Sequence, residues 1–315
     1  MLNTLKNTLN QISSLIEHKS NVVFLDYPFY FNVGDLLIMH GTLQFFRENN
    51  IHIKLNLCKE NFSLKKLKKN IDSNTTIILQ GGGNFGDIYN KHQELREKVI
   101  QNFPDNRIIL LPQSVHFSTE ENLLKSQIVF NQHKNLYLFA RDSVSYDILK
   151  KFSPNTQLMP DMAHYLHNHL VQQTQKKEKT LLFLRRDKEM LTEQLNISHS
   201  ENTKPIDWAD LISKTDIKKY KKIKRLMKYN KILNNSRIDT FSYETWEKLS
   251  YELIQRSNDY FLNFDNIITS RLHAHIFGSL LNIRTQIIDN NYKKNSLYHK
   301  EWTSSNQDHT LYKFK

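Results

Sequence analysis

The sequence predicts an α/β protein of two domains, each with a parallel sheet, and a cleft between them. The chain has 315 residues, which is too many for one small core and suits two domains of ordinary size. Short apolar runs alternate with amphipathic stretches through the first half, and the apolar pattern resumes after a polar stretch at residues 167–180. We therefore expect one domain over residues 1–170 and a second over residues 171–315.

The first half is expected to alternate strands with helices. Its apolar runs predict strands at Val22–Asp26, Ile51–Leu57, Thr76–Gln80, Arg107–Leu111 and Leu136–Ala140. Its amphipathic stretches predict helices near Leu36–Glu48, His92–Asn102, Glu120–Phe130 and Ser143–Lys151. This order is typical of βαβ units, which build a parallel sheet with helices on both faces.

Ligands of such sheets bind beyond the carboxyl ends of the strands. Four polar segments follow the expected strands at that edge, namely "YPFYFNVGD", "GGGNFGD", "PQSVHF" and "RDS". We expect these four loops to form one half of a binding cleft.

The second half has fewer clear elements. A strand is expected at Leu181–Asp187, followed by a weakly patterned region, expected to be loop, that extends to about Lys204. Helices are expected at Ile217–Leu233 and Glu244–Tyr260, and strands at Ile267–Ser270 and Gln286–Asp289.

Composition limits the class of protein. Apolar residues make up 39% of the chain and aromatic residues 11%, which is enough for globular cores. The net charge of +12 favours anionic partners, whether phosphorylated metabolites, nucleic acid or an acidic membrane surface. A single cysteine, Cys58, excludes an intramolecular disulfide and a cysteine-based zinc site. The sequence shows neither a secretion signal nor roughly 18 consecutive apolar residues, so we expect a cytoplasmic protein.

The glycine-rich segment allows three interpretations. Gly81, Gly83 and Gly86 satisfy the G-x-G-x-x-G spacing of a dinucleotide site. Such a site also needs an acidic residue at the end of the next strand, whereas Asp105 lies before that strand. A tight turn is the second interpretation. The third, which we favour, is close approach of the backbone to an anionic or sugar ligand.

Two further segments also have structural and functional interpretations. Asp35 is a good N-cap and Gly34 a good turn residue, but together with Asn32 they also lie at the expected cleft, as does Arg141. Arg185 and Arg186 end an expected strand. A guanidinium can bind a carboxylate or phosphate with two parallel hydrogen bonds, so one of these arginines is expected to meet an anion.

The segment "IITSRLHAHIFGSLL" carries Arg271, His273 and His275 at alternate positions. Three interpretations stay open, a metal site, a buried structural histidine, and a general acid beside an anion-binding arginine. No cluster of carboxylates or cysteines supports a metal, so we expect none. Histidine suits the acid role because its pKa lies near neutral pH.

The lysine-rich helix expected at Ile217–Leu233 is either a solvated face or a contact with an anionic membrane. The sequence has no recognisable nucleic-acid-reading module, so we do not expect nucleic acid as a partner.

Taken together, six segments resemble the polysaccharide pyruvyltransferase family, most closely its bacterial exopolysaccharide and capsule members. They are "NVGDLLIMHGT", "LQGGGNFGD", "LPQS", "ARDSVSYDIL", "PDMAH" and "ITSRLHAHIFGSLL", in the family's order. Residues from about 191 to 243 match nothing in that pattern. The resemblance implies a glycosyltransferase-B-like fold of two facing Rossmann-type domains. It also implies transfer of pyruvate from phosphoenolpyruvate to two hydroxyls of one sugar, as a cyclic ketal.

The resemblance also implies roles for individual residues. His273 acts as the acid, and Arg271, Leu272 and one of Arg185 or Arg186 hold the donor in the second domain. The acceptor binds on the side of the first domain. The other expected substrate-binding residues are Asn32, Asp35, Gly82, Gly83, Asn84, Gln113, Ser114 and Arg141.

No cofactor is expected besides phosphoenolpyruvate as donor substrate. The acceptor is a sugar or glycan, either free, nucleotide-linked or lipid-linked at the inner face of the membrane. Two rival functions remain, a nucleotide-sugar-dependent glycosyltransferase of the same fold and a catalytically silent scaffold of a polysaccharide assembly complex.

Overall fold

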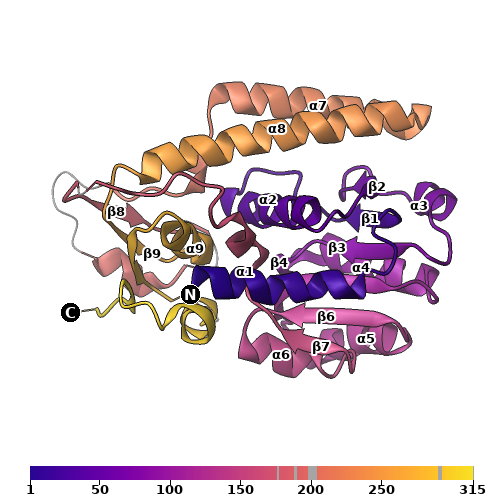
Figure 1. Ribbon diagram of the computed structural model, residues 1–315, viewed down its shortest axis with the longest axis horizontal. Helices are drawn as coiled ribbons and strands as arrows, with labels where there is room; N and C mark the ends of the chain where they lie inside the picture. The colour runs from indigo at the N-terminus through magenta and orange to yellow at the C-terminus, as the bar shows by residue number, and fades with distance from the viewer. Residues whose placement is uncertain (176, 188–189, 198–203, 290–292, 315) are drawn as a thin grey trace.

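Two parallel sheets form the centre of the molecule in the computed structural model, which describes the chain except residues 176, 188–189, 198–203, 290–292 and 315 (Figure 1). The larger sheet has the strand order β2-β1-β3-β5-β6-β7, and β4 pairs with β5 beside this path. Its strands are β1 (Val22–Leu25), β2 (Ile53–Leu57), β3 (Thr76–Leu79), β4 (Gly82–Gly86), β5 (Ile108–His116), β6 (Leu136–Ala140) and β7 (Thr156–Leu158). The smaller sheet has the order β11-β10-β9-β8, with β8 (Thr180–Phe183), β9 (Asn266–Thr269), β10 (Arg284–Ile287) and β11 (His309–Leu311). The predicted α/β class with parallel sheets is confirmed.

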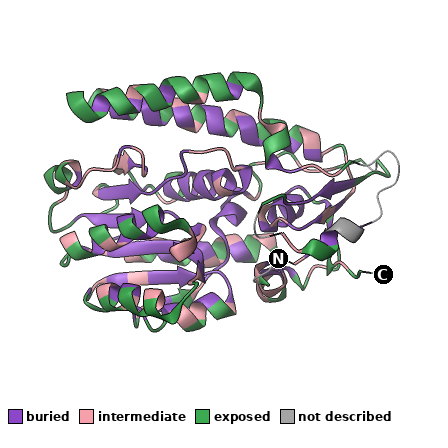
Figure 2. Ribbon diagram, turned by 180° about the vertical axis from the view of Figure 1, so that it is seen from behind, coloured by how far each residue is buried: buried purple, intermediate pink, exposed green. Residues whose placement is uncertain are grey.

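Helices bury both faces of the larger sheet. Successive residues of β1 belong to two different core clusters. Val22 and Phe24 belong to one, and Val23 and Leu25 belong to the other. This is the two-residue period of a strand whose two faces are both covered. Figure 2 shows the strands buried between helices with exposed outer sides. The helices of this half are α1 (Leu2–Asn10), α2 (Val33–Glu48), α3 (Leu64–Asn70), α4 (Asn90–Asn102), α5 (Glu120–Asn131) and α6 (Ser143–Leu149).

Four sequence-based expectations need correction. The glycine-rich loop contains the strand β4, because Gly82 pairs with Gln113 and Gly86 with His116. The same pairing extends β5 through the expected loop at 112–116. The strand expected at 181–187 ends at Phe183, so both arginines lie beyond it. Part of the loop expected between Asp187 and about Lys204 is a short 3₁₀ helix at Thr192–Asn196, and its residues 188–189 and 198–203 lie outside the described residues.

The second half contributes α7 (Lys214–Leu233), α8 (Ser236–Phe261), α9 (Leu272–Leu280) and α10 (Lys294–Tyr298). One core cluster contains Phe24 of the first sheet, Trp246 of α8 and Ile267 of the second sheet. The predicted division at residue 170 falls in the link between the two sheets, and it stays a prediction, as does the glycosyltransferase-B-like description. None of the helices in the described part of the chain combines the length and the apolar character needed to cross a bilayer.

The helices α7 and α8 form an antiparallel pair, the hairpin α7–α8, which lies across the first half of the chain (Figure 1). The indole Nε1 of Trp246 donates to the carbonyl oxygen of Pro28 over 2.7 Å. The ring centroids of Phe29 and Trp246 are 4.9 Å apart, and the two rings pack edge to face. The guanidinium of Arg47 on α2 pairs with Glu247 at 2.5 Å. The hairpin therefore fixes the segment after β1, which leads into the cavity described below.

Replacing Trp246 with alanine is expected to lower the free energy of unfolding by about 3–5 kcal/mol. The indole is fully buried, so its removal leaves a cavity and an unpaired carbonyl oxygen at Pro28. Urea denaturation measures the change. Phe241→Ala on the same helix is the control, because its side chain is 60% exposed and should change stability by less than about 0.5 kcal/mol. Equal effects of the two substitutions would contradict the role given to Trp246.

Candidate active site

A cavity of about 430 Å³ lies where the carboxyl ends of the two sheets meet. Its walls come from segments that follow β1, β2, β6, β8, β9 and β10, together with β4. This agrees with the general position of ligand sites in parallel sheets. The predicted site residues in its walls are Asn32, Asp35, Gly83, Asn84, Arg141, Arg185, Arg271, Leu272 and His273. Sequences far apart in the chain thus converge on one space.

Arg271 occupies the N-cap position of α9, and two carboxylates hold its guanidinium group. Its Nε and Nη2 atoms donate to the two oxygens of Asp207, over 2.9 and 2.6 Å. Its Nη1 atom donates to Oδ2 of Asp187 over 2.6 Å. The forked geometry fixes the plane of the guanidinium, as expected of a bidentate arginine–carboxylate pair. The sequence did not indicate these two acidic partners.

The neighbouring arginines Arg185 and Arg186 pair with different carboxylates. Arg185 lies in the cavity wall, where its Nε donates to Asp187 over 2.9 Å. Arg186 lies outside that wall and donates to Asp210 and to the carbonyl oxygen of Pro205. Consecutive residues of an extended chain point to opposite sides, which explains the difference. Arg185 is therefore the arginine of the pair that can meet a ligand in the cavity.

His273 lies beside a buried ion pair. Its Nε2 atom is 3.3 Å from Oδ2 of Asp161, which also accepts from Nη1 of Arg141 over 2.5 Å. Burial alone would raise the pKa of Asp161, but the His273 ring and then Arg141 outweigh it and hold this pKa well below its usual range. An ionised carboxylate can only accept hydrogen bonds, so Asp161 orients the ring when Nε2 of His273 carries a hydrogen. Asp161 belongs to the segment "PDMAH", but the sequence did not single it out.

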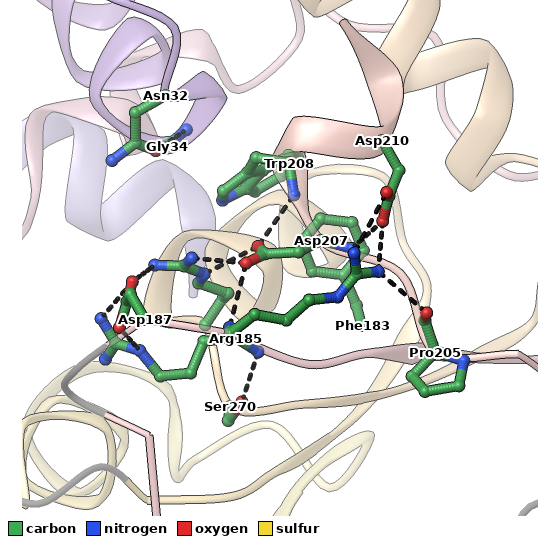
Figure 3. Close-up of polar contacts among 12 residues, drawn as sticks. Asn32, Gly34, Phe183, Arg185, Asp187, Pro205, Asp207, Trp208, Asp210 and Ser270 are labelled. Atoms are coloured by element: carbon green, nitrogen blue, oxygen red, sulfur yellow. Dashed lines mark hydrogen bonds and ion pairs between the residues drawn. The ribbon is translucent and has the colours of Figure 1, made fainter.

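The backbone of Gly34 lies directly against the imidazole. A Cβ atom on Gly34 would be 2.8 Å from Cβ and from Nδ1 of His273, closer than real atoms approach. The sequence led us to expect Gly34 in a turn and Asp35 as the N-cap. In the structure Asn32 is the N-cap, and Gly34 and Asp35 lie in the first turn of α2 (Figure 3). The missing side chain of Gly34 allows α2 and α9 to meet at the cavity.

Other polar groups from the first half also line the cavity. Asp35 accepts from the hydroxyl of Tyr30 over 3.0 Å and from Nδ2 of Asn32 over 2.8 Å. Burial, and then the charge of Asp35, raise the pKa of Tyr30 well above its ordinary value. The carbonyl oxygen of Asn84 accepts from Nη1 of Arg96 over 2.9 Å.

Arg96 belongs to a network that the sequence did not reveal. Its Nη2 atom is 3.3 Å from Asp26, and Nδ1 of His92 is 2.7 Å from the same carboxylate. Asp26 ends the first expected strand, and this position was the feature of the sequence that could have indicated the network. Through the hydrogen bond from Arg96, the network supports the position of Asn84.

Three other predicted site residues lie outside the cavity walls. Ser114 is buried and accepts from Nε of Arg141 over 2.9 Å. Gln113 donates to the carbonyl oxygen of Gln80, and Gly82 lies in β4 beneath Asp35. Their predicted contact with substrate stays a prediction, and what the structure shows for Ser114 is support of Arg141.

Comparison with known proteins agrees with this arrangement. A family model described as "Polysaccharide pyruvyl transferase" matches residues 32–292. The chain is 36% identical over 301 residues to "Putative pyruvyl transferase EpsO" of Bacillus subtilis (strain 168), covering 95% of this chain and 90% of the relative.

The chain belongs to the polysaccharide pyruvyl transferase family. The resemblance seen in the sequence is thereby confirmed. Membership supports transfer of a pyruvyl group to polysaccharide, so the chain is a transferase with a polysaccharide as its implied acceptor.

Two more distant similarities span most of the chain. "Pyruvyl transferase 1" of Schizosaccharomyces pombe is 25% identical, over 92% of this chain and 75% of the relative. The crystal structure of an uncharacterized protein from Klebsiella pneumoniae subsp. pneumoniae aligns with a TM-score of 0.63 and 19% identity, over 98% of this chain and 99% of the other. At that identity the likeness shows the fold alone.

In this family member His275 has a structural position. It is fully buried, with Nδ1 2.7 Å from the hydroxyl of Thr285 and Nε2 2.9 Å from that of Thr303. The ring of His309 lies 5.0 Å from that of His275. Burial first, and then repulsion from His309, hold the pKa of His275 well below its ordinary value. Within the described residues, no group of three or more His, Cys, Asp or Glu side chains is arranged to hold a metal ion.

Gly34→Ala is expected to destabilise the protein by about 1–3 kcal/mol, because the new methyl group overlaps the His273 ring. The measurement is a double-mutant cycle by urea denaturation. In the His273→Gly background the penalty should vanish and change sign, since alanine favours a helix over glycine by about 1 kcal/mol. A penalty of equal size in both backgrounds would show that the clash lies elsewhere.

Acidification is expected to destabilise the protein between about pH 6.5 and pH 4. Burial lowers the pKa of His164 to about 4 and that of His309 to about 4. The unfolded chain therefore binds protons in this window that the folded chain does not, and each such histidine contributes up to about 1.4 kcal/mol per pH unit. Urea denaturation at several pH values measures the slope.

His164→Phe provides the test of that assignment. Both ring nitrogens of His164 lack a hydrogen-bond partner within the part of the chain that the structure describes, so phenylalanine loses no bond there. The variant should show a shallower loss of stability between pH 6.5 and 5. An unchanged slope would show that His164 does not cause the loss of stability on acidification.

Proposed function

We propose that this family member transfers pyruvate from phosphoenolpyruvate to two hydroxyls of a sugar, as a cyclic ketal, in exopolysaccharide or capsule synthesis. The observation that carries the proposal is the convergence of Arg271, Arg185 and Arg141 with His273 in the lining of one cavity. The proposal includes the glycosyltransferase-B-like description of the fold and a cytoplasmic location.

The arginine wall suits a donor with a carboxylate and a phosphate. Guanidinium groups bind both with forked hydrogen bonds. Asp187 and Asp207 already hold Arg271 in place, so ligand binding needs little further ordering of that side chain. The cavity of about 430 Å³ lies within the usual range for sites that bind small ligands.

His273 supplies the acid in the proposed reaction. Its imidazolium gives a proton to the methylene carbon, and the electron pair of the carbon–carbon double bond forms the new C–H bond. The adjacent carbon becomes electron-poor, and the oxygen of a sugar hydroxyl bonds to it while its proton passes to the imidazole. The bond from that carbon to the phosphate oxygen then breaks, with its electron pair leaving on phosphate. The second hydroxyl closes the ring, and its proton leaves with the phosphate.

The surrounding charges support each of these steps. Arg271 and Arg185 stabilise the negative charge of the departing phosphate. Asp161 holds the imidazole ring in one orientation, and Arg141 balances the charge of that carboxylate. The oxygens of Asp35 and Asn84 also line the cavity and can accept hydrogen bonds from sugar hydroxyls, so the proposal assigns the acceptor to their side of the site.

Arg185→Ala is expected to weaken binding of phosphoenolpyruvate at least about tenfold, measured by titration calorimetry. Asp187 keeps Arg271 as a partner in this variant, so the fold should survive. Arg186→Ala is the matched control, because its guanidinium pairs with Asp210 outside the cavity wall. Its dissociation constant should stay within about twofold of the unchanged protein.

Three outcomes would overturn the proposal. Equal losses in the two variants would show that the cavity does not distinguish these arginines. Binding of a nucleotide sugar, without binding of phosphoenolpyruvate, would favour a glycosyltransferase of the same fold. Failure to bind either compound, in a protein that stays folded, would favour a silent scaffold.

A further inference from the structure

The turn of the hairpin α7–α8 exposes several large apolar side chains. Ile232 is 85% exposed, and Tyr229, Leu233 and Phe241 are each exposed by more than half. All four lie near the turn between the two helices. Large apolar side chains gathered on one exposed surface mark interaction sites in soluble proteins.

Basic side chains surround this apolar group. The basic residues of α7 are Lys214, Lys218, Lys219, Lys221, Lys222, Lys224, Arg225, Lys228 and Lys231. The single acidic residue of the helix, Asp216, is buried and pairs with Arg256 at 2.6 Å. Lys221, Lys224, Arg225, Lys228 and Lys231 line a groove of about 530 Å³ on the helix.

The helix α3 extends the basic surface. Lys66 of α3 pairs with Asp239 of α8, which brings α3 against the start of α8. Lys65, Lys68 and Lys69 on the same short helix are exposed. Figure 1 shows α3 beneath the end of the hairpin. Positive charge thus lies on two elements at the same end of the molecule.

We propose that the surface formed by the hairpin turn and its flanking lysines docks on an anionic lipid bilayer. Tyr229, Ile232 and Leu233 enter the boundary between headgroups and acyl chains. The lysines of α7 and α3 contact anionic headgroups. A bilayer matches both halves of this pattern, since basic amphipathic segments bind anionic membranes through buried apolar area together with charge. A soluble acidic polymer would match the lysines but would leave the aliphatic side chains in water.

The proposed surface is close to the cavity. Tyr220 of α7 lies in the cavity wall, and Ile232 follows twelve residues later on the same helix. At 1.5 Å per residue the separation along the helix is about 18 Å. Docking through the hairpin would hold the cavity near the lipid surface. The inference does not depend on which reaction the cavity performs.

Vesicle flotation of the full-length protein tests the proposal. The vesicles contain phosphatidylcholine with about 30% phosphatidylglycerol, or phosphatidylcholine alone. Binding should require the anionic lipid and should weaken as salt rises, because exposed charges are screened. The fourfold variant Lys221→Gln, Lys222→Gln, Lys224→Gln and Lys228→Gln should lower the bound fraction at least about tenfold. Ile232→Ser with Leu233→Ser should weaken binding without changing the net charge.

Matched controls lie on α5, on α6 and just beyond them. Lys125→Gln, Lys134→Gln, Lys150→Gln and Lys151→Gln remove the same charge from exposed positions, and Leu124→Ser with Ile128→Ser remove two exposed apolar side chains of α5. Both controls should bind vesicles like the unchanged protein. The proposal fails if the unchanged protein ignores anionic vesicles, if it binds both vesicle types equally, or if controls and hairpin variants behave alike. Binding of a soluble acidic polysaccharide through the same lysines, without vesicle binding, would also overturn it.

Discussion

The site depends on the close approach of α2 to α9, where the backbone of Gly34 lies against the imidazole of His273. The first half of the chain supplies the glycine backbone, and the second half supplies the imidazole ring that packs against it. Asp161 completes the arrangement, because it binds His273 and Arg141 while its own backbone N–H donates to the hydroxyl of Tyr298. The position of the ring is therefore set by three segments that meet only in the folded chain.

Carboxylates give the cationic wall its order. Asp187 accepts from both Arg185 and Arg271, and Asp207 binds Arg271 through two parallel hydrogen bonds. Partly buried ion pairs of this kind add little to net stability, because desolvation offsets their attraction. Their effect here is geometric, since they orient guanidinium groups that would otherwise sample many rotamers. The wall is thereby prepared for an anion before any ligand arrives.

Local patterns predicted the strands at 22–26, 76–80 and 136–140, because buried strands of a parallel sheet read as short apolar runs. They could not predict β4, since glycine-rich segments have low strand propensity and Gly82–Gly86 is a strand only by pairing with β5. The motifs grouped His273, Arg271 and Asn84, and the structure places all three in the lining of one cavity. They could not show which of Arg185 and Arg186 faces the cavity, because Asp187 and Asp210 decide this in three dimensions. Glycine is required at position 34 because His273 packs against it, and the two residues are 239 positions apart in the sequence.

The hairpin α7–α8 limits how the molecule can move. It is joined in sequence to the second sheet, yet its indole at position 246 and its carboxylate at 247 are bonded to the first half. Swinging the two sheets apart would break these bonds and open a hydrophobic core that both halves share. Hinge opening is therefore disfavoured, in contrast to enzymes whose lobes close over a ligand. Substrate and product are therefore expected to pass through the mouth of the cavity while the two sheets stay together.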